Sequence, residues 1–157
     1  MPFNTKHVMN TILERAFKEG RRDMTPMKAQ KMLFYTNGWN LAITGKAAIS
    51  EPFEVWPYGP VVPSIYHDLK CFGSNPITTY IRDPASENSY VVSPNCKQLY
   101  ESLDIAWEKY IGLPAVTLSA MTHEAGGPWD IAKRHGDTNI SDELLREYFV
   151  RIAKSQA

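Results

Sequence analysis

Few residues of this chain could perform acid–base chemistry, and they lie far apart in the sequence. Histidine occurs four times, and one copy, His123, is followed directly by Glu124. An imidazole beside a carboxylate can act as a general acid or base when both groups converge on a bound substrate. With His67 as a third group and with Trp56 and Tyr58 as walls, this pair defines one candidate for a small catalytic or ligand-binding pocket.

Patterns for metal binding and nucleophilic catalysis are weaker still. His67 and Cys71 are four residues apart, a helical spacing for two ligands, but two ligands do not make a metal site. His123 is followed by Glu-Ala-Gly-Gly, where a zinc protease needs a second histidine on the same helical face. Two cysteines are too few for a disulfide framework, which indicates a reducing compartment. We therefore predict a cytoplasmic protein that is not an enzyme and that has no cofactor and no metal.

The most distinctive stretch is residues 56–66, which holds three large aromatic residues, three prolines and one glycine. Each proline restricts its own φ and excludes the residue before it from the α region, so the segment is stiff. Aromatic rings on a stiff backbone lose little entropy on burial, which suits either a structural corner or a surface that binds a partner. The pattern predicts a strand that ends at Trp56, a turn through 58–60 and a helix that starts at Pro63.

The elements that must position this stretch are mainly helical. Thr25-Pro26 pairs a capping residue with the imino acid that tolerates the first helical position, and it predicts a helix that ends near Gly45. Apolar residues spread over more than half of this helix, so we expect it to be central. Strands are predicted over 53–56 and 89–93, paired as a small ribbon. Further helices are predicted over residues 5–19, 63–73, 95–111, 116–124 and 129–134, with a last one capped by 141–143.

Two further aromatic groups allow a structural or a binding interpretation. Tyr35 and Trp39 are four residues apart on the central helix and share one face, which forms either a core stripe or an exposed groove. Gly126-Gly127-Pro128 ends one helix and starts the next, and it directs the indole of Trp129 into the core or a groove.

The length and the net charge limit the remaining classes of protein to which this chain could belong. A chain of 157 residues can bury a full core as one domain, which we expect to span 1–157 with its central part at about 25–149. Lysine and arginine total 17, as do aspartate and glutamate, whereas a nucleic-acid binder usually shows a basic excess. The sequence contains no run of about 18 consecutive apolar residues, so no membrane span is predicted. The fold class is mainly α, a compact domain of six to seven helices with a two- or three-stranded β element.

The order and spacing of several blocks resemble the Panacea domain, a family of phage-associated and antitoxin proteins. The most specific blocks are Trp-x-Tyr-Gly-Pro-Val at 56–61 and Thr-His-x5-Trp at 122–129. The resemblance extends from about Thr25 to Phe149. The blocks that carry it lie at residues 29–35, 38–39, 45–46, 54–66, 118–124 and 128–129.

This resemblance implies the antitoxin half of a bacterial or prophage toxin–antitoxin pair. Such proteins neutralise unrelated toxins directly, and at least one relative delivers its toxin to a protease as an adaptor. The implied partner is a cognate toxin encoded by the adjacent gene, with a protease as a second implied partner and with nucleic acid and membrane disfavoured. The residues predicted to contact the toxin are Tyr35, Trp39, Trp56, Tyr58, Pro60, Tyr66, His123 and Trp129.

Overall fold

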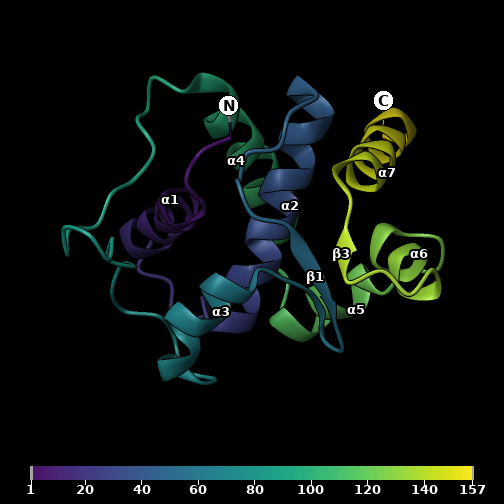
Figure 1. The fold of residues 1–157 in the computed structure, drawn as a ribbon. Coiled ribbons are helices and arrows are strands. Elements are labelled where there is room, and N and C mark those ends of the chain that lie inside the picture. Colours follow the sequence, from purple (N-terminus) through teal and green to yellow (C-terminus); the bar gives the residue numbers. More distant parts are fainter. Residues whose placement is uncertain (1, 157) are drawn as a thin grey trace.

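One long helix, α2 (Pro26–Thr44), runs through the centre of the molecule in the computed structural model, which describes residues 2–156 (Figure 1). Its start is capped as predicted, because the Thr25 hydroxyl accepts a hydrogen bond from the Lys28 backbone N–H at 3.4 Å. Its end is also as predicted, since Gly45 adopts a left-handed conformation with φ of +74°. Side chains on every face of α2 are buried, which confirms its central place.

The other helices surround α2, and each lies close to its predicted position. Within residues 2–156 the structure contains seven α-helices, of which α1, α4, α5 and α7 contact α2 most extensively. Figure 1 shows α1 and α7 on opposite sides of α2. None of the described helices is long and apolar enough to cross a membrane. Their bounds are α1 Thr5–Lys18, α3 Pro63–Leu69 with a 3-10 turn Lys70–Phe72, α4 Lys97–Tyr110, α5 Ala115–Thr122, α6 Pro128–Arg134 and α7 Asp142–Ser155.

A small antiparallel sheet of three strands lies against the helices, in the order β2-β1-β3. The strands are β1 (Phe53–Trp56), β2 (Gly59–Val61) and β3 (Asn139–Ile140). Trp56 lies opposite Gly59, so the β1–β2 loop has two residues and the predicted turn through 58–60 is displaced. Proline is tolerated within β2 because this strand lies at the sheet edge.

The predicted strand over 89–93 is wrong, because side chains of α1 satisfy the backbone groups of that segment. The Asn10 amide donates to the Tyr90 carbonyl at 3.1 Å, and the Val92 N–H donates to the Thr11 hydroxyl at 2.9 Å. In Figure 1 the segment belongs to the teal loop that passes around the outside of α1. β1 pairs along one edge with β2 and along its other edge with β3, which comes from the C-terminal third of the chain.

Buried polar side chains of α2 fasten the segments that carry the aromatic stretch. The Gln30 amide accepts from the Val62 N–H at 3.0 Å and donates to the Val62 carbonyl at 3.1 Å. At the far end of the helix the Asn37 side chain accepts from the Ala48 N–H at 2.8 Å. A buried amide that bonds to a backbone N–H and carbonyl fixes both position and direction of a loop. The start of α3 is therefore held directly against α2.

Candidate functional site

Three aromatic side chains meet at one corner of the surface, which we call the aromatic corner: Trp56, Tyr58 and Tyr66. The rings of Trp56 and Tyr66 lie 5.0 Å apart between centroids. Tyr58 stands at the tip of the β1–β2 hairpin with 69% of its surface exposed, and Tyr66 on α3 is 43% exposed. Large aromatic residues held in exposed positions are typical of the centres of protein interfaces.

An apolar groove of about 190 Å³ lies beside the aromatic corner. Its walls come from the start of α2, from β2 and from α3, and they include Met27, Val61 and Leu69. Few polar atoms line it. A concave apolar surface beside exposed aromatic residues is a typical recognition site.

A buried lysine, Lys31, also lines this groove. Its side chain is 1% exposed, and its ammonium group donates to the Pro60 carbonyl at 3.2 Å. No carboxylate among residues 2–156 lies within 4.0 Å of this ammonium. Burial lowers the pKa of Lys31 to about 8, because the charged form is poorly solvated there.

The hairpin that carries Tyr58 is fastened from beneath by α5 and α6. The two nitrogens of His123 face the Ser119 carbonyl at 2.6 Å and the Pro57 carbonyl at 2.8 Å. The Ser119 hydroxyl donates to the Tyr58 carbonyl at 2.6 Å. The Trp129 indole donates to the Trp56 carbonyl at 3.0 Å. Three successive carbonyl groups of the hairpin therefore have fixed partners.

These contacts leave little for the alternative pocket around His123. Both of its ring nitrogens lie within hydrogen-bonding distance of backbone carbonyl oxygens, so His123 is placed as a structural tie between the end of α5 and the hairpin. Glu124 accepts a hydrogen bond from the Tyr148 hydroxyl at 2.6 Å, and His67 is an exposed residue of α3 whose ring lies 5.6 Å from that of Tyr66. No group of three or more His, Cys, Asp or Glu side chains within residues 2–156 could hold a metal.

Tyr35 and Trp39 belong to the core, the first of the two interpretations that their spacing allowed. They are 3% and 4% exposed. The Tyr35 ring stacks on Tyr110 at 3.9 Å, and the Trp39 indole donates to the Tyr110 hydroxyl at 3.2 Å. Burial raises the pKa of Tyr35 above its ordinary value.

Of the remaining predicted contact residues, Pro60 and Trp129 are buried, and Trp56 and His123 are partly buried.

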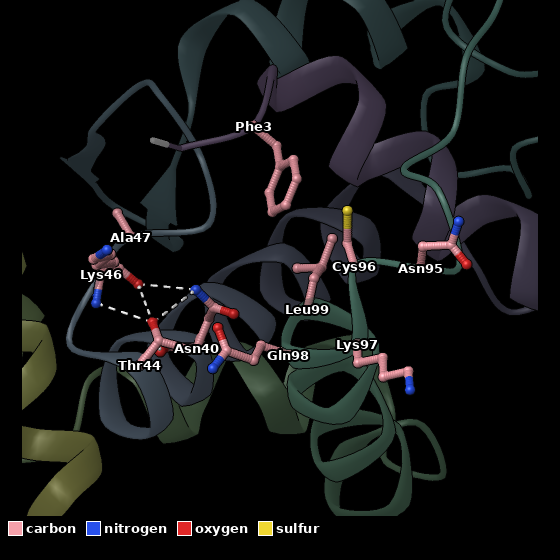
Figure 2. A pocket seen from close by; sticks show the side chains of 10 residues that line it. All are labelled: Phe3, Asn40, Thr44, Lys46, Ala47, Asn95, Cys96, Lys97, Gln98 and Leu99. Atoms are coloured by element: carbon pink, nitrogen blue, oxygen red, sulfur yellow. Dashed lines mark hydrogen bonds between the residues drawn. The ribbon is translucent and has the colours of Figure 1, made fainter.

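A larger hollow of about 460 Å³ lies at the other end of α2 (Figure 2). Asn40 and Thr44 line it, and both donate to the Lys46 carbonyl, at 2.9 Å and 3.2 Å. None of the predicted contact residues lines this hollow. The side chains of Asn40 and Thr44 already have partners within the chain. Because the aromatic corner lines the smaller groove and not this hollow, the groove is the stronger candidate despite its smaller volume.

Lys31 is the groove residue whose importance the sequence did not reveal. A lysine is usually exposed, and its charge alone predicts a solvated helix face. The available signal was its position between Gln30 and Met32 in a helix whose apolar residues cover most faces. In such a helix even charged residues must be buried.

Comparison with known proteins shows the family to which this chain is similar. A family model described as "Antitoxin SocA-like, Panacea domain" matches residues 30–130, more than half of the chain. "Antitoxin SocA" of Caulobacter vibrioides (strain NA1000 / CB15N) is 30% identical over 158 residues, which cover 93% of this chain and 82% of that protein. No solved structure matches the chain. The matched range contains the aromatic corner, Lys31 and His123.

Proposed function

The chain belongs to the SocA-like antitoxin family with the Panacea domain, and we propose that it neutralises a toxin protein by binding it through the aromatic corner and the groove. Family membership supports an antitoxin role and disfavours an enzyme. The observation that carries the choice of surface is the exposure of Tyr58 and Tyr66 beside an apolar groove. Because α5 and α6 already hold the hairpin, binding costs little ordering of the backbone.

The proposed partner is a toxin encoded by the adjacent gene, and the proposed compartment is the cytoplasm. Both cysteines, Cys71 and Cys96, are free thiols, as a reducing compartment favours. Of the predicted contact residues, Tyr58, Tyr66 and Trp56 would touch the toxin. Pro60, His123 and Trp129 would support the hairpin, and Tyr35 and Trp39 would support α2 beneath it.

Co-expression with the product of the adjacent gene tests this proposal. We expect rescue of growth and a complex that copurifies. Tyr58→Ala and Tyr66→Ala should each weaken binding by about tenfold or more, with little change in thermal stability, because truncating an exposed hot-spot aromatic costs about 2 kcal/mol of binding energy. Tyr90→Ala is the matched control, since Tyr90 is 43% exposed like Tyr66 but lies in the loop around α1. If the wild-type chain neither rescues growth nor forms a complex, the proposal is wrong.

The half-life of the toxin separates direct neutralisation from delivery to a protease. Direct binding leaves the toxin intact and bound to the chain, so its half-life should be unchanged or longer when the chain is present. Delivery to a protease shortens that half-life and makes rescue depend on the protease. We propose the first route, because the rigid corner and groove account for inhibition by contact alone.

A further inference from the structure

We infer that the groove binds a segment of the partner protein in which an apolar side chain lies next to an aspartate or glutamate, and that Lys31 selects the carboxylate. This inference rests on the proposed function and names the chemistry of the toxin segment. Lys31 is the charged residue of the groove lining, and the other walls are mainly apolar. Recognition would then combine burial of one apolar side chain with one ion pair.

The hydrogen bonding of Lys31 is incomplete in the free protein. An ammonium group has three N–H donors, and the structure pairs this one with a single neutral acceptor, the Pro60 carbonyl at 3.2 Å. The side chain is only 1% exposed, so water does little to satisfy the remaining donors. A buried cation in this state is costly unless a carboxylate joins it. A carboxylate from a partner would supply both the missing acceptors and the opposite charge, provided that the side chains at the mouth of the groove move aside and admit it to the ammonium.

The acidic side chain that contacts Trp56 is already engaged. Glu54 on β1 accepts a hydrogen bond from the Trp56 indole at 3.0 Å, and it makes no ion pair with Lys31 within 4.0 Å. No aspartate or glutamate lines the groove. The walls therefore offer no internal counter-charge, which leaves the groove complementary to an acidic group from outside.

A second buried lysine on the same helix shows that the chain can satisfy such a group internally. Lys28 is also 1% exposed, but its ammonium donates to the Asp23 carboxylate at 2.8 Å and to the Ile111 carbonyl at 2.6 Å. The two lysines are equally buried and differ in whether the chain supplies the carboxylate. This difference is why we assign partner recognition to Lys31 and a structural role to Lys28.

The size of the groove indicates what accompanies the carboxylate. About 190 Å³ is smaller than the roughly 300–1,000 Å³ of sites for drug-sized molecules, so the groove suits a side chain or two of a protein segment. Met27, Val61 and Leu69 provide apolar contact for one of them. The exposed rings of Tyr58 and Tyr66 would cover the flanking backbone.

Selection of peptides on the purified chain tests the inference without knowledge of the toxin. A displayed library of random 12-residue peptides is enriched on the wild-type protein, and the best binders are synthesised with each acidic residue as the acid and as the matching amide. We expect enriched peptides to place an apolar residue next to Asp or Glu. Replacing that acid by its amide should weaken binding to the wild type at least tenfold, and binding to Lys31→Met less than twofold.

Stability measurements on the same variants separate recognition from a structural role. Lys31→Met should fold with an equal or higher melting temperature, since it removes a poorly paired buried charge, yet it should lose the preference for the acid. Lys28→Met should lower the melting temperature and keep that preference. Should Lys31→Met fail to fold, Lys31→Arg retains the charge and should retain the preference.

Three results of the peptide selection would overturn the inference: no enriched peptide, enriched peptides without acidic residues, or equal binding of acid and amide. These results are distinct from failure of the proposed function. Toxin neutralisation that survives Lys31→Met would leave the antitoxin proposal intact and remove the role of Lys31. Acid-selective peptide binding without any toxin rescue would leave the role of Lys31 intact and remove the antitoxin proposal.

Discussion

At the scale of single residues, this chain shows how local pairing decides the role of a buried charge. Lys28 and Lys31 occupy one helix and are equally hidden from solvent. Lys28 has a carboxylate partner, and Lys31 has a single carbonyl. Burying a charge without an opposite charge costs stability, so such a residue is a candidate for recognition.

The first prediction concerns the pH dependence of stability at Lys31. The pKa of Lys31 is about 8 in the folded chain, against an ordinary value of 10.5. As the pH rises, the folded chain therefore loses the Lys31 proton at a lower pH than the unfolded chain does. Between these values the unfolded chain binds more protons, and wild-type stability should rise with pH relative to Lys31→Met. At pH 7 the free energy of unfolding of Lys31→Met should exceed that of the wild type, and this difference should shrink at pH 10. The change in the difference should be on the order of 3 kcal/mol at most.

Urea unfolding of both proteins at pH 7 and pH 10 measures this difference. The titratable groups on the surrounding elements, Tyr58, Tyr66, Glu54 and His123, are present in both proteins, so their direct contributions cancel in the comparison. A stability difference that stays constant over this pH range would contradict the prediction.

The second prediction concerns Gly59, whose backbone conformation and surroundings both exclude a side chain. Its φ is +115°, and an added Cβ would lie 2.6 Å from the Thr122 hydroxyl oxygen and 3.0 Å from Lys31 Cε. Gly59→Ala should therefore destabilise the chain by about 2 kcal/mol or more, measured by chemical denaturation. Gly20→Ala is the control, because Gly20 follows the end of α1 with a φ of +64° and has no atom within 4 Å of the added Cβ. It should cost only about 1 kcal/mol, and equal losses would show that the crowding at Gly59 is unimportant.

At the scale of elements, the β1–β2 hairpin is an exposed feature supported by helices from a distant part of the chain. The hairpin comprises residues 53–61, whereas its supports on α5 and α6 lie at 119–129. A two-stranded hairpin is marginal alone in water, so these contacts and β3 give it a defined shape. The aromatic corner is rigid because of this support.

The third prediction removes one of the supports. Trp129→Phe keeps an aromatic ring but deletes the hydrogen bond to the Trp56 carbonyl. We expect a loss of about 1 kcal/mol in stability and faster amide hydrogen exchange in residues 53–61, with exchange in α2 and α4 unchanged. Trp107→Phe is the comparison, because its indole bonds to Glu19 instead and the hairpin should not respond. Unchanged exchange in the hairpin of Trp129→Phe would show that this bond does not hold the corner.

At the scale of the whole molecule, the charge balance limits the partners that the chain can attract. Equal numbers of acidic and basic residues give a net charge of zero. Long-range attraction to a phosphate backbone requires a basic excess or stripe. Recognition must then depend on local surfaces such as the groove.

The fourth prediction follows from this balance. Mobility-shift assays with duplex DNA and single-stranded RNA should show no binding that falls steeply as salt rises from 50 to 200 mM, because such a dependence needs several phosphate contacts. The appearance of strongly salt-dependent binding would favour a nucleic-acid regulator. The basic cluster at Lys18, Arg21 and Arg22 is the region to substitute in that case.

Much of the fold could be predicted because helix boundaries depend on local chemistry. Thr25-Pro26, Gly45 and Pro63 mark helix ends through capping and fixed φ values, and the structure confirms each. The strand at 53–56 was also predicted, but its partners were not. Residues 89–93 include one Tyr and two Val, residue types that favour strands, yet Asn10 and Thr11 of α1 take up their backbone hydrogen bonds. Such competition between distant groups leaves no periodic trace in the sequence.

The sequence by itself determined the helical architecture, the stiffness of residues 56–66 and the membership of the antitoxin family, because each depends on neighbours along the chain. Only the tertiary structure decided which aromatic residues face solvent and which lysine lacks a carboxylate. Tyr35 and Tyr58 look equally suited to an interface in the sequence, but one stacks on Tyr110 and the other stands on a hairpin tip. Burial and charge pairing arise between residues tens of positions apart, and only packing brings those residues together.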